Sequence, residues 1–111
     1  MGLTTLSLKR CPQMDDECLK VISECLPSLT SLHFFSSPKI SIKGVQSVTK
    51  GLRSVRELSL IHCWNLETDA LEVLKQDLPC LRHCNLAHCW RVSQAGLEGF
   101  REARPGVELI A

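Results

Sequence analysis

The chain has 111 residues, with 13 lysines and arginines against 12 aspartates and glutamates, a formal net charge of +1, and 44% hydrophobic residues. This composition is typical of one domain, residues 1–111, and it lacks the basic excess expected for binding nucleic acid or an anionic membrane. No run of 18 apolar residues and no signal-peptide pattern occurs in the sequence, so we expect an intracellular protein, cytoplasmic or nuclear, that neither spans a membrane nor is secreted.

A period of 26 residues organises the sequence. It holds four times without a gap, in units of residues 3–28, 29–54, 55–80 and 81–106, and residues 107–111 begin a partial fifth strand. The openings of the units read LTTLSLKRC, LTSLHFFSS, VRELSLIHC and LRHCNLAHC. A period of this length is typical of proteins in which stacked units bury a shared core, and it therefore predicts a solenoid.

Each unit is predicted to open with a short strand. The first, fourth and sixth positions are apolar, and the spacing of two between the fourth and the sixth is that of a strand with one buried side. These residues are Leu3, Leu6 and Leu8, then Leu29, Leu32 and Phe34, then Val55, Leu58 and Leu60, and finally Leu81, Cys84 and Leu86.

A helix is predicted after each strand. It follows Asp15, Ser41, Glu67 or Ser93, and three of these four are good N-caps. Apolar or small residues then recur with a spacing that turns one stripe of an eleven-residue helix toward the strands. The stripes contain Cys18, Leu19, Ile22 and Leu26, then Gly44, Val45, Val48 and Leu52, and then Ala70, Leu71, Leu74 and Leu78. Parallel strands stack at about 4.8 Å and packed helices at about 8–10 Å, so we expect a curved stack with the strands inside.

The pattern L-x-x-L-x-L-x-x-C, followed by an apolar residue and a helix, resembles the cysteine-containing leucine-rich repeat of F-box/leucine-rich-repeat proteins. Residues 3–11 and 55–63 carry it most clearly, and the resemblance extends over residues 3–106. The second unit departs from it, because Ser37 replaces the cysteine and Phe34 and Phe35 enlarge the strand. The resemblance implies an α/β leucine-rich-repeat solenoid of four units, curved, with parallel strands inside and helices outside.

Repeats of this family select substrates for a cullin-based ubiquitin ligase, and the resemblance implies a related role for this chain. That role also requires an F-box, for which there is no room ahead of Leu3. We therefore expect either a fragment or short isoform of a longer protein, or a stand-alone adaptor.

The seven cysteines are expected to be free thiols, since their number is odd and no export signal accompanies them. Cys11, Cys63 and Cys89 share the ninth position of their units, where a small side chain with a weak S–H donor can pack and still reach a neighbouring carbonyl.

Cys80, Cys84, His88 and Cys89 fall within ten residues and are all possible zinc ligands. The 26-residue period instead predicts that Cys84 and Cys89 are buried and that the His88 side chain points away from them. We therefore expect no metal and no cofactor. A metal-binding or redox protein using Cys80, Cys84 and Cys89 is kept as an alternative. His83 and Cys84 are adjacent in a strand and face opposite sides, and no catalytic motif is present, so we expect no enzyme.

Strand side chains that point away from the core form rows across the sheet. The rows are Thr5, Ser31, Glu57 and His83, then Ser7, His33, Ser59 and Asn85, and then Lys9, Phe35, Ile61 and Ala87. The third row places Phe35 beside Ile61 in exposed positions, and contiguous apolar surface often marks an interaction site.

The tripeptides His62-Cys63-Trp64 and His88-Cys89-Trp90 recur in phase beside these rows. Equivalent positions of parallel neighbours should bring the two histidines together and the two tryptophans together, on the rim that follows the strands. Tryptophan is enriched at binding hot spots, although each of these could instead cover the loop of the next unit.

We therefore expect a protein–protein interaction module that binds a partner on its concave face and adjoining rim, with a structural or assembly adaptor as the alternative. Leu3, Leu6 and Leu8 lack a covering neighbour, so the uncapped ends predict self-association. The expected partner-binding residues are His33, Phe35, Glu57, Ile61, His62, Trp64, His83, His88 and Trp90.

Overall fold

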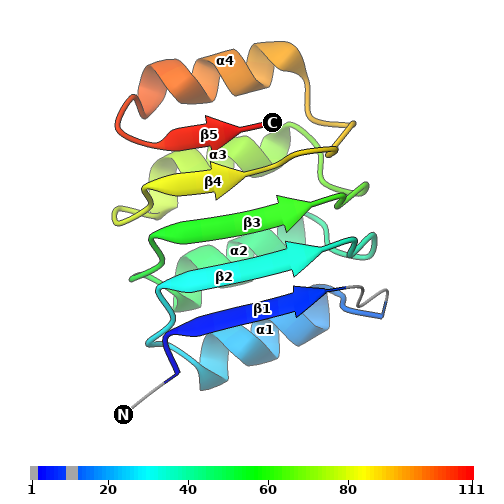
Figure 1. The fold of residues 1–111 in the computed structure, drawn as a ribbon, viewed down its shortest axis with the longest axis vertical. Coiled ribbons are helices and arrows are strands. Elements are labelled where there is room, and N and C mark those ends of the chain that lie inside the picture. Colours follow the sequence, from blue (N-terminus) through cyan, green and yellow to red (C-terminus); the bar gives the residue numbers. More distant parts are fainter. Residues whose placement is uncertain (1–2, 10–12) are drawn as a thin grey trace.

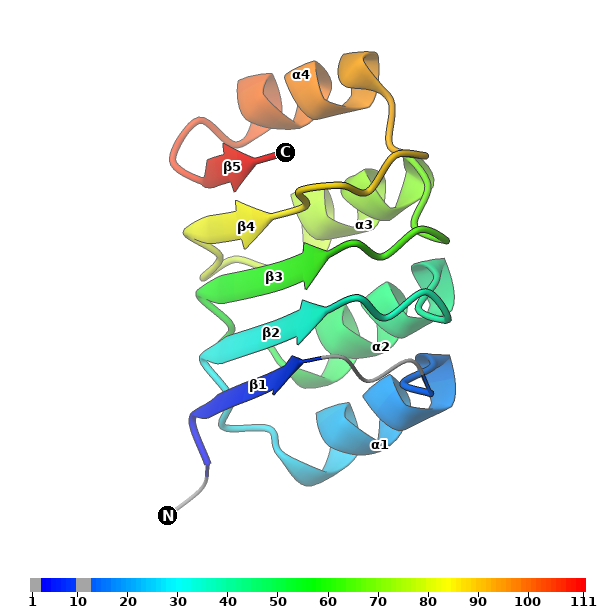
Figure 2. The same cartoon turned by 45° about the vertical axis from the view of Figure 1, so that its right-hand side comes forward.

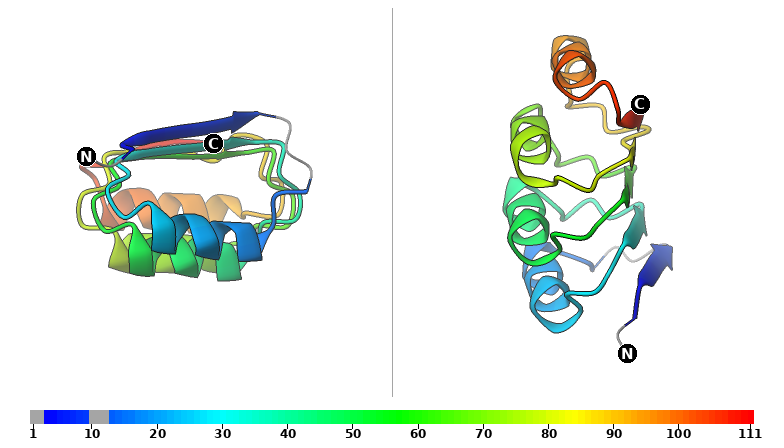
Figure 3. Two further views of the ribbon diagram at one scale, coloured as in Figure 1. Left: turned by 90° about the horizontal axis from the view of Figure 1, so that it is seen from below. Right: turned by 90° about the vertical axis from the view of Figure 1, so that its left-hand side faces the viewer.

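Strands and helices alternate along the chain in the computed structural model, which describes residues 3–9 and 13–111 (Figure 1). The described elements make an α/β protein with a five-stranded parallel sheet and four helices. Figure 3 shows that the helices cover one face of the sheet and leave the other face open. In chain order the elements are β1 (Thr5–Lys9), α1 (Asp16–Cys25), β2 (Ser31–Phe35), α2 (Ile42–Gly51), β3 (Glu57–Ile61), α3 (Asp69–Asp77), β4 (His83–Asn85), α4 (Gln94–Ala103) and β5 (Glu108–Ile110).

Each strand pairs with the next one in the sequence, in the order β1-β2-β3-β4-β5. Between β1 and β4 every paired residue lies 26 positions from its partner, as in Leu32 with Leu58 and Leu58 with Cys84. The rows predicted across the open face are therefore confirmed for the residues within these strands.

The fifth strand departs from this spacing. The partial strand expected at residues 107–111 is observed at Glu108–Ile110, and Cys84 pairs with Leu109, which is 25 positions away. Because side chains alternate along a strand, a shift by one residue exchanges the two faces. Leu109 consequently enters the core, while Ile110 remains 49% exposed.

Three of the four predicted helix caps are confirmed. The side chains of Asp15, Ser41 and Ser93 accept hydrogen bonds from backbone N–H groups in the first turns of α1, α2 and α4. The bond from the Cys18 N–H lowers the pKa of the Asp15 carboxyl. The third helix begins later than expected, with Thr68 rather than Glu67 at its N-cap, and the helices contain nine or ten residues rather than eleven.

The core lies between the sheet and the helices. Most of the predicted strand and stripe residues from the second to the fourth strand are buried there, but Leu6, Leu8 and Ile22 are only half-buried. The difference arises because β1 is the edge strand of the described sheet and α1 the outermost described helix at that end, so that β1 pairs only with β2 and α1 packs beside α2. The largest fully buried side chains include Leu19, Leu29, Leu32, Phe34, Ile40, Leu58, Leu74, Leu78 and Phe100.

Candidate functional site

The loops that leave the strands lie together along one edge of the sheet (Figure 2). These loops contain Ser36, directly after β2, His62, directly after β3, and His88, three residues after β4, with φ angles of 60°, 59° and 63°. Backbone hydrogen bonds hold two of them, from the Ser36 N–H to the Ile61 carbonyl at 2.8 Å and from the His62 N–H to the Ala87 carbonyl at 3.0 Å. A left-handed backbone is costly for residues other than glycine and persists only where its surroundings impose it. The surrounding structure therefore imposes the backbone conformation at these positions.

Two ring pairs form on this edge, and we name His62, Trp64, His88 and Trp90 the aromatic rim. The imidazoles of His62 and His88 stack with centroids 4.4 Å apart, and the indoles of Trp64 and Trp90 are nearly parallel with centroids 6.2 Å apart. Trp90 also meets both imidazoles in edge geometry, at 6.2 and 6.3 Å. The predicted juxtaposition of like residues is thus confirmed.

The tryptophans remain accessible despite these contacts. Trp64 is 49% exposed and Trp90 is 72% exposed, which places both among the few large apolar side chains at the surface of the described chain. Four rings that contact one another present a pre-formed apolar surface bearing indole N–H donors.

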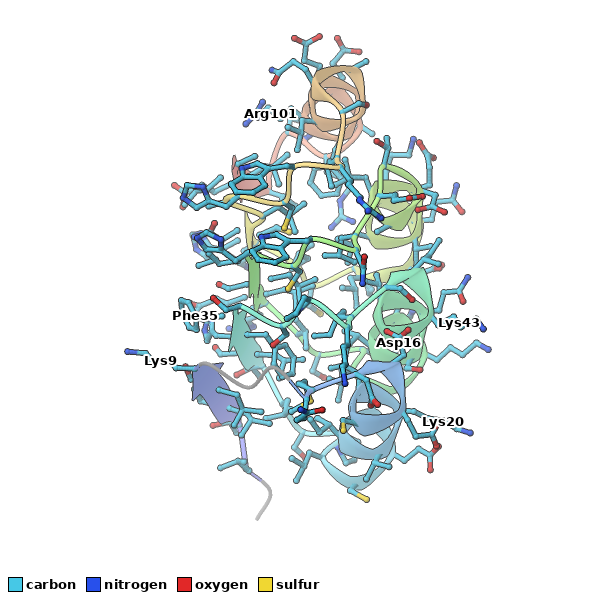
Figure 4. The ribbon with its side chains drawn as sticks, turned by 90° about the vertical axis from the view of Figure 1, so that its right-hand side faces the viewer. Lys9, Asp16, Lys20, Phe35, Lys43 and Arg101 are labelled. Carbon is cyan, nitrogen blue, oxygen red and sulfur yellow. The ribbon has the colours of Figure 1, made fainter. Side chains whose placement is uncertain are left out.

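Phe35 and Ile61 lie next to the aromatic rim, paired on adjacent strands. They were expected to be exposed, but each is half-buried. Neighbours in the same row cover part of each side chain, and the ammonium group of Lys9 lies 5.9 Å from the centroid of the Phe35 ring. Figure 4 shows Phe35 and Lys9 on the strand side of the molecule, opposite Lys20 and Lys43 on the helix side.

The polar residues of the open face contact one another across the strands. His33 Nδ1 lies 2.7 Å from Ser59 Oγ, Ser31 Oγ donates to Glu57 Oε1 at 3.1 Å, and His83 Nδ1 lies 3.2 Å from Glu108 Oε1. His33, Glu57 and His83, which were predicted at the site, line one cavity of about 260 Å³ together with Glu108. Glu108 was missed from the sequence because the 26-residue period places Leu109, not Glu108, beside His83.

The three buried cysteines are packed thiols. Cys63, Cys84 and Cys89 are buried, and the Cys89 Sγ donates to the Leu60 carbonyl at 2.8 Å. Desolvation, reinforced by the nearby Cys89 thiol, raises the pKa of both Cys63 and Cys84 to about 12, and burial also raises the pKa of Cys89. A thiol that stays protonated is a poor nucleophile and a poor metal ligand. Cys11, the remaining ninth-position cysteine, lies outside the described residues.

The structure gives no geometric support to the alternative of a zinc site at Cys80, Cys84 and Cys89. Cys80 is exposed, whereas Cys84 and Cys89 are buried. Within residues 3–9 and 13–111, no group of three or more histidine, cysteine, aspartate or glutamate side chains could hold a metal ion.

The chain is an α/β protein whose parallel sheet carries helices on one face and an aromatic rim along one edge. None of the helices in the described ranges is long and apolar enough to cross a membrane. No protein-family model matches the sequence, and no curated protein matches it significantly.

Proposed function

We propose that the chain is a curved leucine-rich-repeat solenoid of four units that recognises a protein partner through its open strand face and the aromatic rim. The observation that carries the proposal is the stacked pair of Trp64 and Trp90, 49% and 72% exposed beside the stacked histidines. A tryptophan packed fully over a neighbouring loop would expose little of its ring, whereas Trp90 keeps 72% of its surface exposed. The exposure of both indoles instead favours a surface that a partner covers.

The proposal draws further support from the rigidity of this surface. The two histidines have a left-handed backbone and the four rings contact one another, so little side-chain freedom remains to be lost when a partner binds. Phe35 and Ile61 extend the apolar area, and the polar residues His33, Glu57 and His83 border it on the open face. An apolar centre with a polar border is the usual composition of a binding surface.

The class of partner is proposed from the family resemblance alone. The cysteine-containing repeat pattern suggests a role inside the cell, in selecting a substrate for a cullin-based ubiquitin ligase.

The test compares a rim variant with a surface control. The full chain, the double variant Trp64→Ala/Trp90→Ala and the control Lys20→Ala/Glu98→Ala are each used as bait in quantitative affinity capture, and their melting temperatures are measured in parallel. Hot-spot truncation costs about 2 kcal/mol or more, so we expect the rim variant to lose most of a partner that the control retains.

Stability separates recognition from a structural role. The rim variant should lose less stability than Leu58→Ala, which removes a buried side chain. If the rim variant unfolds without a selective loss of binding, or if it captures the same partners as the unmodified chain, the assignment of the aromatic rim is wrong.

A further inference from the structure

A second cavity, of about 580 Å³, lies where the chain enters β4 and β5 from α3 and α4. Arg56, Arg82, His83 and Arg104 contribute to its lining, as does Glu108. The aromatic rim follows the strands, whereas this cavity surrounds their starts, so the two surfaces lie at opposite edges of the sheet (Figure 1). The cavity therefore requires an explanation of its own.

The charge of the lining is locally positive although the chain as a whole is nearly neutral. Three arginines line the cavity against one carboxylate, Glu108, which already contacts His83 Nδ1 at 3.2 Å. Arg56 and Arg82 are exposed, and neither side chain makes a hydrogen bond or an ion pair within the part of the chain that the structure describes. Their donors remain available for a ligand.

The backbone holds these two arginines side by side. The N–H groups of Arg82 and His83 both donate to the Arg56 carbonyl, at 2.8 and 3.0 Å. Adjacent parallel strands lie about 4.8 Å apart, so the two guanidinium groups start from neighbouring positions and can reach a common anion. Arginine favours oxyanions because its planar fork matches two of their oxygens.

Arg104 contributes to the cavity by binding backbone carbonyl groups of a neighbouring helix. Its guanidinium group donates to the Lys75 carbonyl at 3.1 Å, to the Leu78 carbonyl at 3.0 Å and to the Leu74 carbonyl at 3.5 Å. These groups belong to the C-terminal end of α3, where unpaired carbonyls carry partial negative charge and would repel an anion. Arg104 compensates that charge and leaves the field of Arg56 and Arg82 dominant.

We propose that this cavity is a binding site for a phosphate monoester or inorganic phosphate, held by Arg56 and Arg82. The site does not depend on the aromatic rim and adds an anion-binding activity to the proposed partner recognition. The same chemistry serves a phosphorylated side chain of a partner and a free phosphate ion, and the experiment distinguishes these two sources.

The test is a titration of the ¹⁵N-labelled full chain monitored by NMR at constant ionic strength. Inorganic phosphate, a phosphoserine peptide, its unphosphorylated form and sodium chloride are added in separate series. We expect saturable chemical-shift changes at the Nε–H groups of Arg56 and Arg82 with inorganic phosphate and with the phosphoserine peptide. The unphosphorylated peptide and sodium chloride should cause none. A tighter response to the phosphopeptide would identify a partner side chain as the source, and an equal or tighter response to inorganic phosphate would identify the free ion.

Variants locate the site. Loss of a charged hydrogen bond costs about 1.5–3 kcal/mol, so Arg56→Gln and Arg82→Gln should each weaken phosphate binding by at least about tenfold. The control Lys50→Gln, on the exposed surface of α2, should leave it unchanged, and all three should keep the unmodified melting temperature. A linear response to phosphate, an equal response to chloride, or full binding by Arg56→Gln/Arg82→Gln would overturn the proposal, whatever the rim variants show.

Discussion

Asp16 Oδ1 accepts a hydrogen bond from the backbone N–H of Gly44 at 3.0 Å, so the first residue of α1 caps the beginning of α2 (Figure 4). The same oxygen accepts the Ser41 N–H at 2.7 Å. Glycine at position 44 makes room for this contact, because a Cβ there would lie 2.6 Å from Oδ1 and would force the Asp16 side chain to move. A similar contact joins α3 to α4, where the Ser93 N–H donates to Thr68 Oγ1 at 2.8 Å.

Asp16→Ala should lower the free energy of unfolding by about 1–2 kcal/mol, because it removes the cap from a neighbouring helix. The adjacent Glu17 is exposed, and Glu17→Ala should change stability by less than about 0.5 kcal/mol. Denaturant titration of both variants checks this. Equal losses would show that Asp16 contributes nothing beyond its charge near the start of α1.

Gly51→Ala should destabilise the protein by about 1–3 kcal/mol, the usual cost of forcing extra atoms into a packed site. An added Cβ would lie 2.7 Å from the Ser23 carbonyl oxygen, which belongs to the backbone of α1 and cannot easily move. Gly99 provides the matched control in α4, since a Cβ there would meet nothing within 4 Å. Gly99→Ala should stabilise the protein by about 0.5–1 kcal/mol through helix propensity, and melting curves should therefore shift in opposite directions.

Leu58→Ala should cost about 2–5 kcal/mol, because Leu58 is buried in β3 with paired strands on both sides. Leu6 occupies the corresponding position of the edge strand and is only half-buried, so Leu6→Ala should cost less. Chemical denaturation gives both values. A loss below about 0.5 kcal/mol for Leu58→Ala would contradict the register.

Stability should fall as the pH rises above 9. An unfolded Cys84 ionises near its ordinary pKa of 9.0, whereas the folded thiol stays protonated up to about 12. The raised folded pKa stabilises the native state fully below pH 9 and loses that contribution as the pH approaches 12, by up to about 1.4 kcal/mol per pH unit. Unfolding measured at pH 8 and pH 10.5 should show a smaller decrease for Cys84→Val than for the unmodified chain. Equal decreases would place this thiol in contact with water.

The exposed edge formed by β1 and α1 should promote self-association. Leu3, just ahead of β1, is 49% exposed, and Val21 on α1 is 51% exposed. Leu3→Lys/Val21→Lys should remain monomeric at concentrations where the unmodified chain and Glu98→Lys associate, as measured by sedimentation velocity. A thermally robust, monodisperse unmodified chain would refute this expectation.

The pairs of residues that meet across the strands were predictable from the repeat. Its 26-residue spacing predicted the row that joins Ser31 to Glu57 and the meeting of His62 with His88 and of Trp64 with Trp90. This was possible because parallel strands in constant register convert a spacing along the chain directly into a contact between strands. The buried faces followed from the alternation of side chains within each strand.

The repeat did not predict the contacts that form where this regularity ends or where long side chains bridge two elements. The one-residue shift of β5 brings Glu108 beside His83, and it depends on how α4 connects to the last strand. Arg104 reaches the carbonyls of α3, and Arg56 and Arg82 border a cavity that no motif marks. A periodic pattern specifies average positions of the backbone, whereas the direction of a flexible arginine and the register of a terminal strand depend on the packing and hydrogen-bonding groups that the folded neighbours present.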